Sequence, residues 1–226
     1  MKTKAKVATE YERGVRAKID ALYPKEGRSD DENIAGARSL IDNTFRNGSA
    51  GEQLLMTICI NDVVMRAVKD ATEEGSDSPA RLDARRTRAL RYFTSVRKDG
   101  TPQEKGAARL FLENVLAREI AKQPREISEY AVDGAHEALK TLWDPGSVGM
   151  LREAMKKVRH CGAWGREGSF MMRQTAELLE QDSKRVPGKS PEKIWKAQKP
   201  LADDGDEKGV DDGYCGRDLD DELGGK

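Results

Sequence analysis

An all-α fold is what the sequence predicts: a single compact domain of about seven or eight helices, with a flexible N-terminal arm and a disordered acidic C-terminal tail. Apolar residues recur at three- and four-residue intervals along most of the chain, whereas the alternation typical of strands is nearly absent. Only 5% of the residues are aromatic, so the core must be built mainly from aliphatic side chains and Met.

Three segments are expected: an N-terminal helix or arm over 1–30, a helical core over 31–183, and a basic linker with an acidic tail over 184–226. Apolar residues at helical spacing predict a first helix that ends before Pro24; they are Val7, Tyr11, Val15, Ile19 and Leu22. The last segment is too polar to offset its ordering entropy by burial, which predicts disorder. Its Trp195 is the exception, expected to dock on its own body or on a neighbouring subunit.

The first two core helices are predicted over 31–45 and 52–71, with a turn at Asn47–Gly51 between them. The segment 52–71 is the most apolar in the chain. It therefore predicts the central buried helix, and its length favours a helix over a strand.

The next helix is rich in arginine. Ser78 provides an N-cap and Pro79 a first-turn proline, and Asp99–Gly100 ends the helix. Thr101–Glu104 has the pattern of a capping box and starts the following helix. Further helices are predicted at about 126–143, 148–160 and 168–182. The last of them is expected to turn its apolar residues to the core, namely Phe170, Met171, Leu178 and Leu179. The glycine-rich stretch 161–168 is expected to be an ordered interhelical loop, and Arg166 and Arg173 are candidate additions to a groove.

The formal net charge of zero hides a segregation of charge along the chain. Residues 201–226 hold ten acids and three bases, which leaves 37 bases and 30 acids in residues 1–200. Residues 79–125 alone hold twelve bases and five acids. A basic region followed by an acidic tail indicates interaction with charged partners rather than a particular fold.

Several classes of protein are disfavoured by what the chain lacks. The charged N-terminus has no apolar signal region, and no window is long enough to span a membrane, so an intracellular protein is expected. Three widely spaced cysteines favour a reducing compartment. Two histidines, His136 and His160, with Cys161 do not make a metal-ligand pattern. We expect no metal, no cofactor and no enzymatic activity.

The helix over 79–98 is the strongest candidate site. On a helical wheel an arginine ridge carrying one aromatic residue adjoins the apolar stripe, a combination suited to phosphate contact and base stacking. The ridge consists of Arg81, Arg85, Arg88 and Tyr92. The full set of candidate nucleic-acid-binding residues adds Arg91, Arg97, Lys98 and Arg109. The competing interpretation is a solvated helix face, salt-bridged to acids of neighbouring helices, but twelve bases to five acids leave few such acids nearby in sequence.

Binding is expected to tolerate any base sequence, because no zinc-finger, RNP1-type or GXXG pattern is present. The acidic tail is expected to contact the basic groove of its own chain and to compete there with polyanions. A tail that serves solubility alone is the alternative.

A helical body with a basic groove, a charged N-terminal arm and a polar tail resembles the nucleoproteins and coat proteins of RNA viruses. Leu90–Phe93, followed by Thr101–Pro102 and Ala107–Ala108, is similar to a segment of the flexuous filamentous plant-virus coat proteins. The similarity covers about 20 residues, and Thr94–Ser95 stand where that family has Phe–Asp. The resemblance implies packaging of single-stranded RNA and self-association.

The sequence thus predicts an RNA-binding, self-associating structural protein, as a viral nucleocapsid or coat protein is, located in the cytoplasm or in a virion. Its expected partners are single-stranded RNA and further copies of itself. Three alternatives remain open: a matrix-like or regulatory module that binds acidic lipid headgroups or an acidic protein, a DNA-binding regulatory protein, and an enzyme with an unrecognised site.

Overall fold

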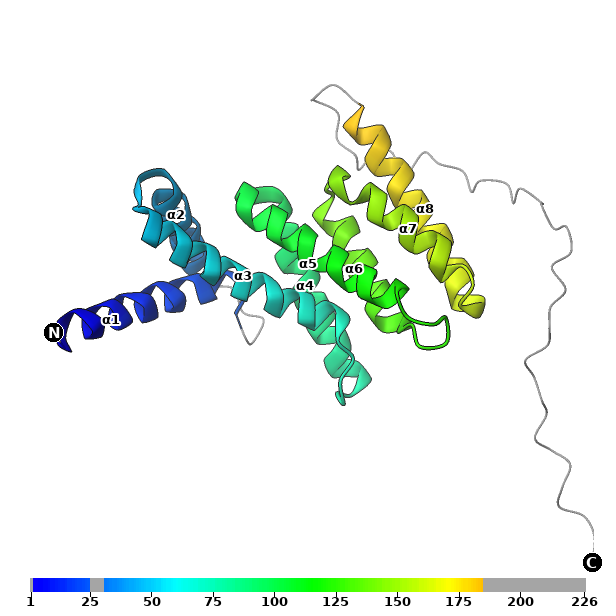
Figure 1. Ribbon diagram of the computed structural model, residues 1–226, viewed down its shortest axis with the longest axis horizontal. Helices are drawn as coiled ribbons and strands as arrows, with labels where there is room; N and C mark the ends of the chain where they lie inside the picture. Colours follow the sequence, from blue (N-terminus) through cyan, green and yellow to red (C-terminus); the bar gives the residue numbers. More distant parts are fainter. Residues whose placement is uncertain (1, 25–30, 185–226) are drawn as a thin grey trace, which may run out of the picture. The chain divides into compact units, whose positions relative to one another are not determined.

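The predicted helices are present in the computed structural model, which describes residues 2–24 and 31–184 (Figure 1). In chain order the elements are α1 (Lys2–Ile19), the 3₁₀ helix η1 (Asp20–Leu22), α2 (Asp31–Asn47), α3 (Ala50–Thr72), α4 (Pro79–Asp99), α5 (Pro102–Ile120), α6 (Glu129–Leu142), the 3₁₀ helix η2 (Pro145–Ser147), α7 (Val148–Val158) and α8 (Gly162–Ser183). No strand occurs among the described residues, so the prediction of an all-α fold is confirmed for them.

The described helices belong to one compact unit. Val15 and Ile19 of α1 are buried, and α1 contacts both α2 and α3. The predicted acidic tail, and all of the basic linker except Lys184, lie outside the described residues, and so does Trp195 of that linker.

Side-chain caps fix the starts of α3 and α5. The hydroxyl of Ser49 accepts a hydrogen bond from the Glu52 N–H at 3.4 Å, and the Glu52 carboxylate accepts one from the Ser49 N–H at 2.8 Å. This complete capping box was missed because Asn47–Gly51 was interpreted only as a turn. At α5, Thr101 Oγ1 accepts from the Glu104 N–H at 3.2 Å as predicted, but the Glu104 carboxylate is turned into the core.

α8 begins six residues before its predicted start at 168, so the expectation of a loop over 161–168 is wrong. Glycine lowers helix propensity, but it also allows close approach of two backbones. A Cβ at Gly165 would overlap the carbonyl oxygen of Val158, at the end of α7. Gly165 thus lets the first turn of α8 pack against α7, and Trp164 is half-buried against the core from that same turn.

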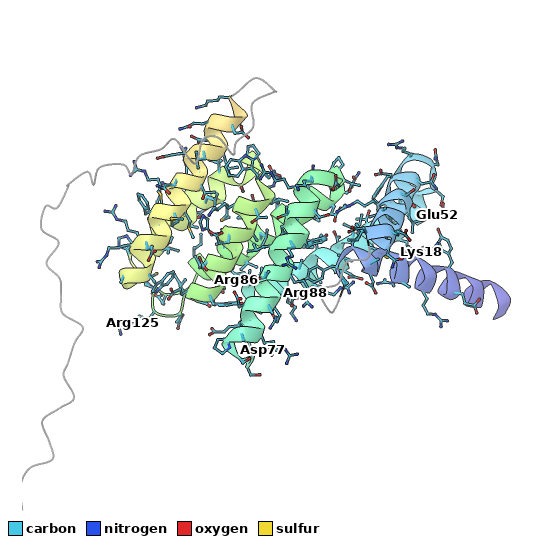
Figure 2. All side chains as sticks on the ribbon, turned by 180° about the vertical axis from the view of Figure 1, so that it is seen from behind. Lys18, Glu52, Asp77, Arg86, Arg88 and Arg125 are labelled. Atoms are coloured by element: carbon cyan, nitrogen blue, oxygen red, sulfur yellow. The ribbon has the colours of Figure 1, made fainter. Side chains whose placement is uncertain are left out.

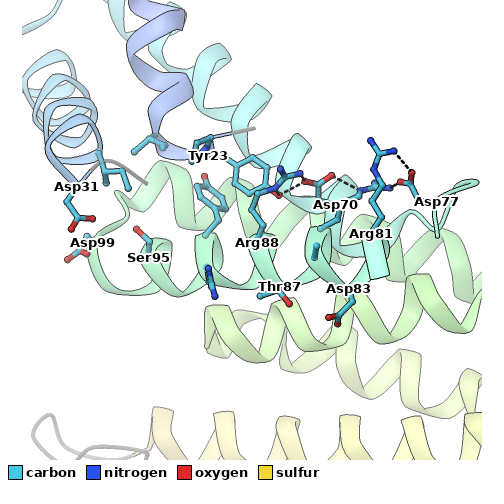
Figure 3. Close-up of a pocket in the computed structure, with 17 residues that line it drawn as sticks. Tyr23, Asp31, Asp70, Asp77, Arg81, Asp83, Thr87, Arg88, Ser95 and Asp99 are labelled. Carbon is cyan, nitrogen blue, oxygen red and sulfur yellow. Dashed lines mark hydrogen bonds and ion pairs between the residues drawn. The ribbon is translucent and has the colours of Figure 1, made fainter. Parts of the chain in front are cut away.

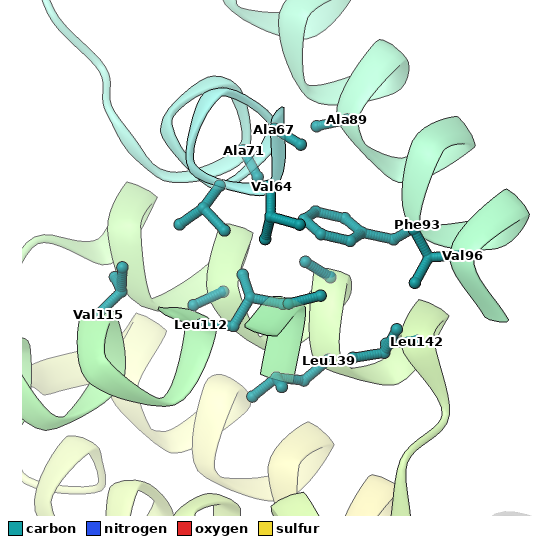
Figure 4. Close-up of a cluster of buried hydrophobic side chains, with 14 of the residues drawn as sticks. Val64, Ala67, Ala71, Ala89, Phe93, Val96, Leu112, Val115, Leu139 and Leu142 are labelled. Atoms are coloured by element: carbon teal, nitrogen blue, oxygen red, sulfur yellow. The ribbon is translucent and has the colours of Figure 1, made fainter. Parts of the chain in front are cut away.

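The core lies where α4 packs on α3, α5 and α6, and Phe93 of α4 is fully buried at this junction (Figure 4). α4 starts at Pro79 as predicted, although the hydroxyl of its N-cap Ser78 makes no capping hydrogen bond. The predicted apolar stripe of α4 is buried at Leu82, Ala89, Phe93 and Val96. α3, predicted as the central buried helix, packs on α4, α5 and α6 but keeps one face in solvent.

Candidate nucleic-acid interface

Two arginines of the predicted ridge are engaged in an ion-pair network (Figure 3). Arg85 Nε lies 3.0 Å from Asp70 Oδ1, and Arg85 Nη1 lies 2.6 Å from Asp77 Oδ2. Arg88 pairs with the other oxygen of Asp70, and its Nε donates to the Tyr23 hydroxyl at 3.2 Å. The expectation that the ridge lacks acidic neighbours is therefore wrong, because the acids come from α3 and the α3–α4 loop rather than from residues 79–125.

Asp70 is the centre of this network. Its carboxylate accepts hydrogen bonds from Tyr23, Arg85 and Arg88. Burial alone would raise the pKa of Asp70, but these three hydrogen bonds and the positive charge of Arg88 outweigh burial and lower the pKa. Burial, followed by the hydrogen bond to Asp70, raises the pKa of Tyr23. The network thus joins η1, α3 and α4 through charged side chains that are less than one-quarter exposed.

Tyr92 is not on the solvent side of the ridge. It is only 4% exposed, and its hydroxyl donates to Glu104 Oε1 at 2.8 Å. Its ring also makes edge contacts with Tyr23 and Phe93. Tyr92 borders the apolar stripe of α4, and the buried Glu104 carboxylate opposite it accepts the hydrogen bond of the phenol hydroxyl. The side chain can therefore turn inward. This placement corrects the expectation that Tyr92 is available for base stacking.

The polar face of α4 is divided between different neighbours. Figure 2 shows Arg86 and Arg88 leaving opposite sides of α4. Arg86 Nη1 lies 2.7 Å from Asp133 Oδ2 of α6, and its guanidinium stacks 4.1 Å from the centre of the Tyr130 ring. An arginine count taken along the helix therefore overstates the positive charge that α4 presents to solvent.

The remaining predicted residues do not form one surface. Arg81 is exposed but pairs with Asp77 at 3.3 Å, whereas Arg91 and Lys98 are exposed and have no ion pair among the described residues. Arg97 and Arg109 both reach the segment after α6: Arg97 stacks on Trp143, and Arg109 lies 3.5 Å from the Asp144 carboxylate.

A cavity of about 1090 Å³ borders the ridge, and its described lining is balanced in charge. The arginines in the lining are Arg81, Arg85, Arg88 and Arg91. The aspartates are Asp31, Asp70, Asp77, Asp83 and Asp99. Four bases facing five acids do not make the basic groove that the sequence predicts, so this cavity does not favour a polyanion.

A second basic surface lies on α7, α8 and the turn between them. Lys156, Lys157, Arg159 and Arg166 are all exposed, and none has a carboxylate within ion-pair distance among the residues that the structure describes. Phe170, predicted to be in the core, is 46% exposed. We call Lys156, Lys157, Arg159, Arg166, Phe170 and Arg173 the α7–α8 basic face.

Helical spacing places these residues, except Lys157, on adjoining ridges. On α7, Lys156 and Arg159 follow Arg152 at intervals of four and three residues, and Arg152 bonds Glu180 of α8 at 2.8 Å. On α8, Phe170 and Arg173 follow Arg166 at the same intervals, and Arg173 lies on the same edge as Glu180. The Arg152–Glu180 pair shows that this edge of α8 borders the ridge on α7. Phe170 therefore lies between Arg166 and Arg173 within the α8 row, and Arg173 also pairs with Glu177 at 3.0 Å.

The sequence contained a signal for this surface. Residues 152–173 hold six bases and two acids, a ratio steeper than that of residues 79–125. Arg166 and Arg173 are predicted from the sequence only as candidate additions to a groove. Phe170 was placed in the core because its position fits the apolar period of α8.

No family model, no curated protein and no solved structure matches this chain. Within the described ranges, no group of His, Cys, Asp or Glu side chains is arranged to hold a metal ion. In the same ranges, no helix is both long and apolar enough to cross a membrane.

Proposed function

We propose that this protein binds single-stranded RNA without sequence specificity, through the α7–α8 basic face, and that it self-associates as a nucleocapsid or coat protein does. The observation that carries the proposal is a set of four exposed cations without acid partners beside an exposed phenylalanine. The set is Lys156, Lys157, Arg159 and Arg166.

Each part of this surface matches a part of a single strand. Guanidinium and ammonium groups bind phosphate oxygens, and they do so most strongly when no carboxylate of their own protein competes. Phe170 offers a flat apolar ring on which any base can stack, which gives affinity without sequence preference. Arg166 and Arg173 lie about 10 Å apart along α8, a distance that spans more than one nucleotide of a strand.

On α4, the exposed Arg81, Arg91 and Lys98 are proposed as secondary phosphate contacts. Arg85 and Arg88 are proposed to act mainly in the fold, because releasing them to a phosphate would leave Asp70 without its cations. The distribution of affinity between the two surfaces follows from this difference in pairing: the α7–α8 basic face contributes most.

The direct test measures binding of a fluorescent oligouridylate over a range of salt concentrations. The variant is Lys156→Ala/Arg159→Ala, and the matched control is Lys18→Ala/Arg46→Ala, which removes two exposed cations elsewhere. If both altered residues contact phosphates, the slope of log K against log salt becomes shallower by about 1.4. Phe170→Ala should weaken binding with no change in slope, since it removes stacking and no charge.

Two further titrations distinguish RNA from the other candidate partners. Duplex DNA and vesicles that contain phosphatidylserine are titrated under the same conditions. Equal loss of affinity in both double variants would overturn the site assignment. Tighter binding to duplex DNA or to vesicles than to RNA would replace RNA by that partner. Purified protein with no bound nucleic acid and no affinity for RNA would overturn the proposed function.

A further inference from the structure

The solvent-facing side of α3 carries a stripe that no charged residue interrupts. The stripe consists of Gly51, Leu54, Ile58, Asn61 and Met65. Leu54 is 62% exposed, Ile58 40% and Met65 52%. From Gly51 to Met65 the stripe is about 21 Å long at the helical rise. In a chain that is 35% charged, an exposed strip of this length without charge indicates contact with another apolar surface.

The spacing of the stripe is that of a helix–helix seam. Its members follow one another at intervals of three, four, three and four residues. This is the a/d pattern of helices that pack side by side through knobs in holes. The seam is separate from the inward face of α3, where Ile60, Val64 and Ala67 are buried.

The stripe is complementary to itself. Ile58 lies midway, seven residues from Gly51 and seven from Met65. If two copies of α3 pack antiparallel about a two-fold axis at Ile58, each Met65 lies over the Gly51 of the other copy. The space above Gly51 is open, because no atom lies within 4 Å of a Cβ built there. The bulkiest end of the stripe thus meets the end with room for it.

We propose that a second copy of this chain docks on the α3 stripe, antiparallel and with two-fold symmetry. The inference names the interface for the self-association in the proposed function, and it does not depend on RNA binding. The seam is one helix wide and about 21 Å long, which is smaller than the roughly 800 Å² per partner of a standard interface. The dimer is therefore weak on its own and forms at micromolar concentrations.

The test uses the residue on the two-fold axis. Ile58→Glu and Ile58→Lys each place two like charges face to face, so each variant should be monomeric in sedimentation at concentrations at which the natural chain dimerises. An equimolar mixture of the two variants should dimerise, because residue 58 then meets its opposite charge. This rescue requires that residue 58 of one copy faces residue 58 of the other copy, as it does at a two-fold axis.

Two further variants keep the test independent of folding. Gly51→Gln fills open space in the monomer and should weaken dimerisation at least tenfold without loss of helix signal. Leu110→Glu alters an apolar residue on α5 that is about as exposed as Met65 of the stripe, and it should leave dimerisation unchanged. A natural chain that stays monomeric at 200 μM, at about a hundred times a typical micromolar dissociation constant, would overturn the proposal. Normal dimerisation of the Ile58 variants and of Gly51→Gln would do the same.

RNA binding is measured on the same proteins. The Ile58 variants should bind a short oligouridylate, long enough for one chain, with natural affinity, and they should lose cooperativity on long RNA. Loss of dimerisation with intact short-oligomer binding supports the interface. If the natural chain dimerises but binds no RNA, the interface holds and the proposed function fails.

Discussion

Replacing Asp70 by Asn tests whether the arginine ridge stabilises the fold. The substitution keeps the size of the side chain and removes the charge that pairs with Arg85 and Arg88. Breaking a fully buried pair costs about 3–5 kcal/mol, and a lost hydrogen bond to a charged group about 1.5–3 kcal/mol. The side chains here are 15–24% exposed, and Arg85 retains Asp77, so water and this second acid offset part of the loss. We expect a loss of about 2 kcal/mol at pH 7.

Urea unfolding followed by circular dichroism measures this loss as a fall of about 1 M in the midpoint. The control is Asp83→Asn, because Asp83 is exposed on α4, the helix of Arg85 and Arg88, and has no ion pair among the described residues. The stability of this control should change by less than about 0.5 kcal/mol. If Asp70→Asn is as stable as this control, the ion pairs contribute little and Arg85 and Arg88 return as candidates for RNA contact.

The pH dependence gives a second check on the same variant. The folded state lowers the pKa of Asp70, so its contribution is fully present above the unfolded pKa of about 3.9 and is lost as the pH falls through the folded value. The difference between the natural chain and Asp70→Asn should be constant from about pH 5 to 8 and should shrink below about pH 4. A constant difference down to pH 3 would contradict the charge as its cause.

Two further predictions concern the packing of α7 and α8 and the titration of a buried histidine. Gly165→Ala should destabilise the fold by about 1–3 kcal/mol, because its Cβ overlaps the Val158 carbonyl oxygen. Gly168→Ala, whose Cβ would lie 3.7 Å from Val158 Cγ1, should be neutral or stabilising; equal effects in urea unfolding would contradict this reasoning. His136 is buried beside Thr175, and burial lowers its pKa, so the unfolded chain binds a proton first and stability should fall as the pH drops below about 6.5. His136→Gln should remove this part of the pH dependence, and an unchanged profile would contradict it.

The bounds and the buried stripe of α4 could be predicted because both depend on local chemistry. Pro79 marks the start of the helix and Asp99–Gly100 marks its end. The apolar period alone places Phe93 on the buried side. The inward orientation of the Tyr92 side chain could not be predicted this way. It depends on Glu104, which lies twelve residues later and is itself turned inward toward Tyr92 and Arg38. A helical wheel shows which side of a helix is polar but not which polar groups are opposite.

The start of α8 shows the same limit in the backbone. The glycines over 161–168 have low helix propensity, so the local sequence disfavours a helix there. Propensity does not include the close packing against α7 that Gly165 makes possible. The gain from packing outweighs the weak local preference. The prediction that Phe170 is buried is wrong for a different reason. α8 lies at the periphery of the bundle, and its apolar residues cover a wider face than its neighbours do, so Phe170 stays exposed.

Position in the bundle also explains why the richest run of arginine is not the most exposed positive surface. α4 packs on α3, α5 and α6, so its polar borders meet acids from other helices: Asp70 and Asp77 on one side and Asp133 on the other. α7 packs on α5, η2 and α8, and most of its cations point away from all three. A central basic helix is neutralised by its neighbours, whereas a peripheral one keeps its charge for a partner. The proposed RNA contact is therefore assigned to the edge formed by α7 and α8 rather than to α4.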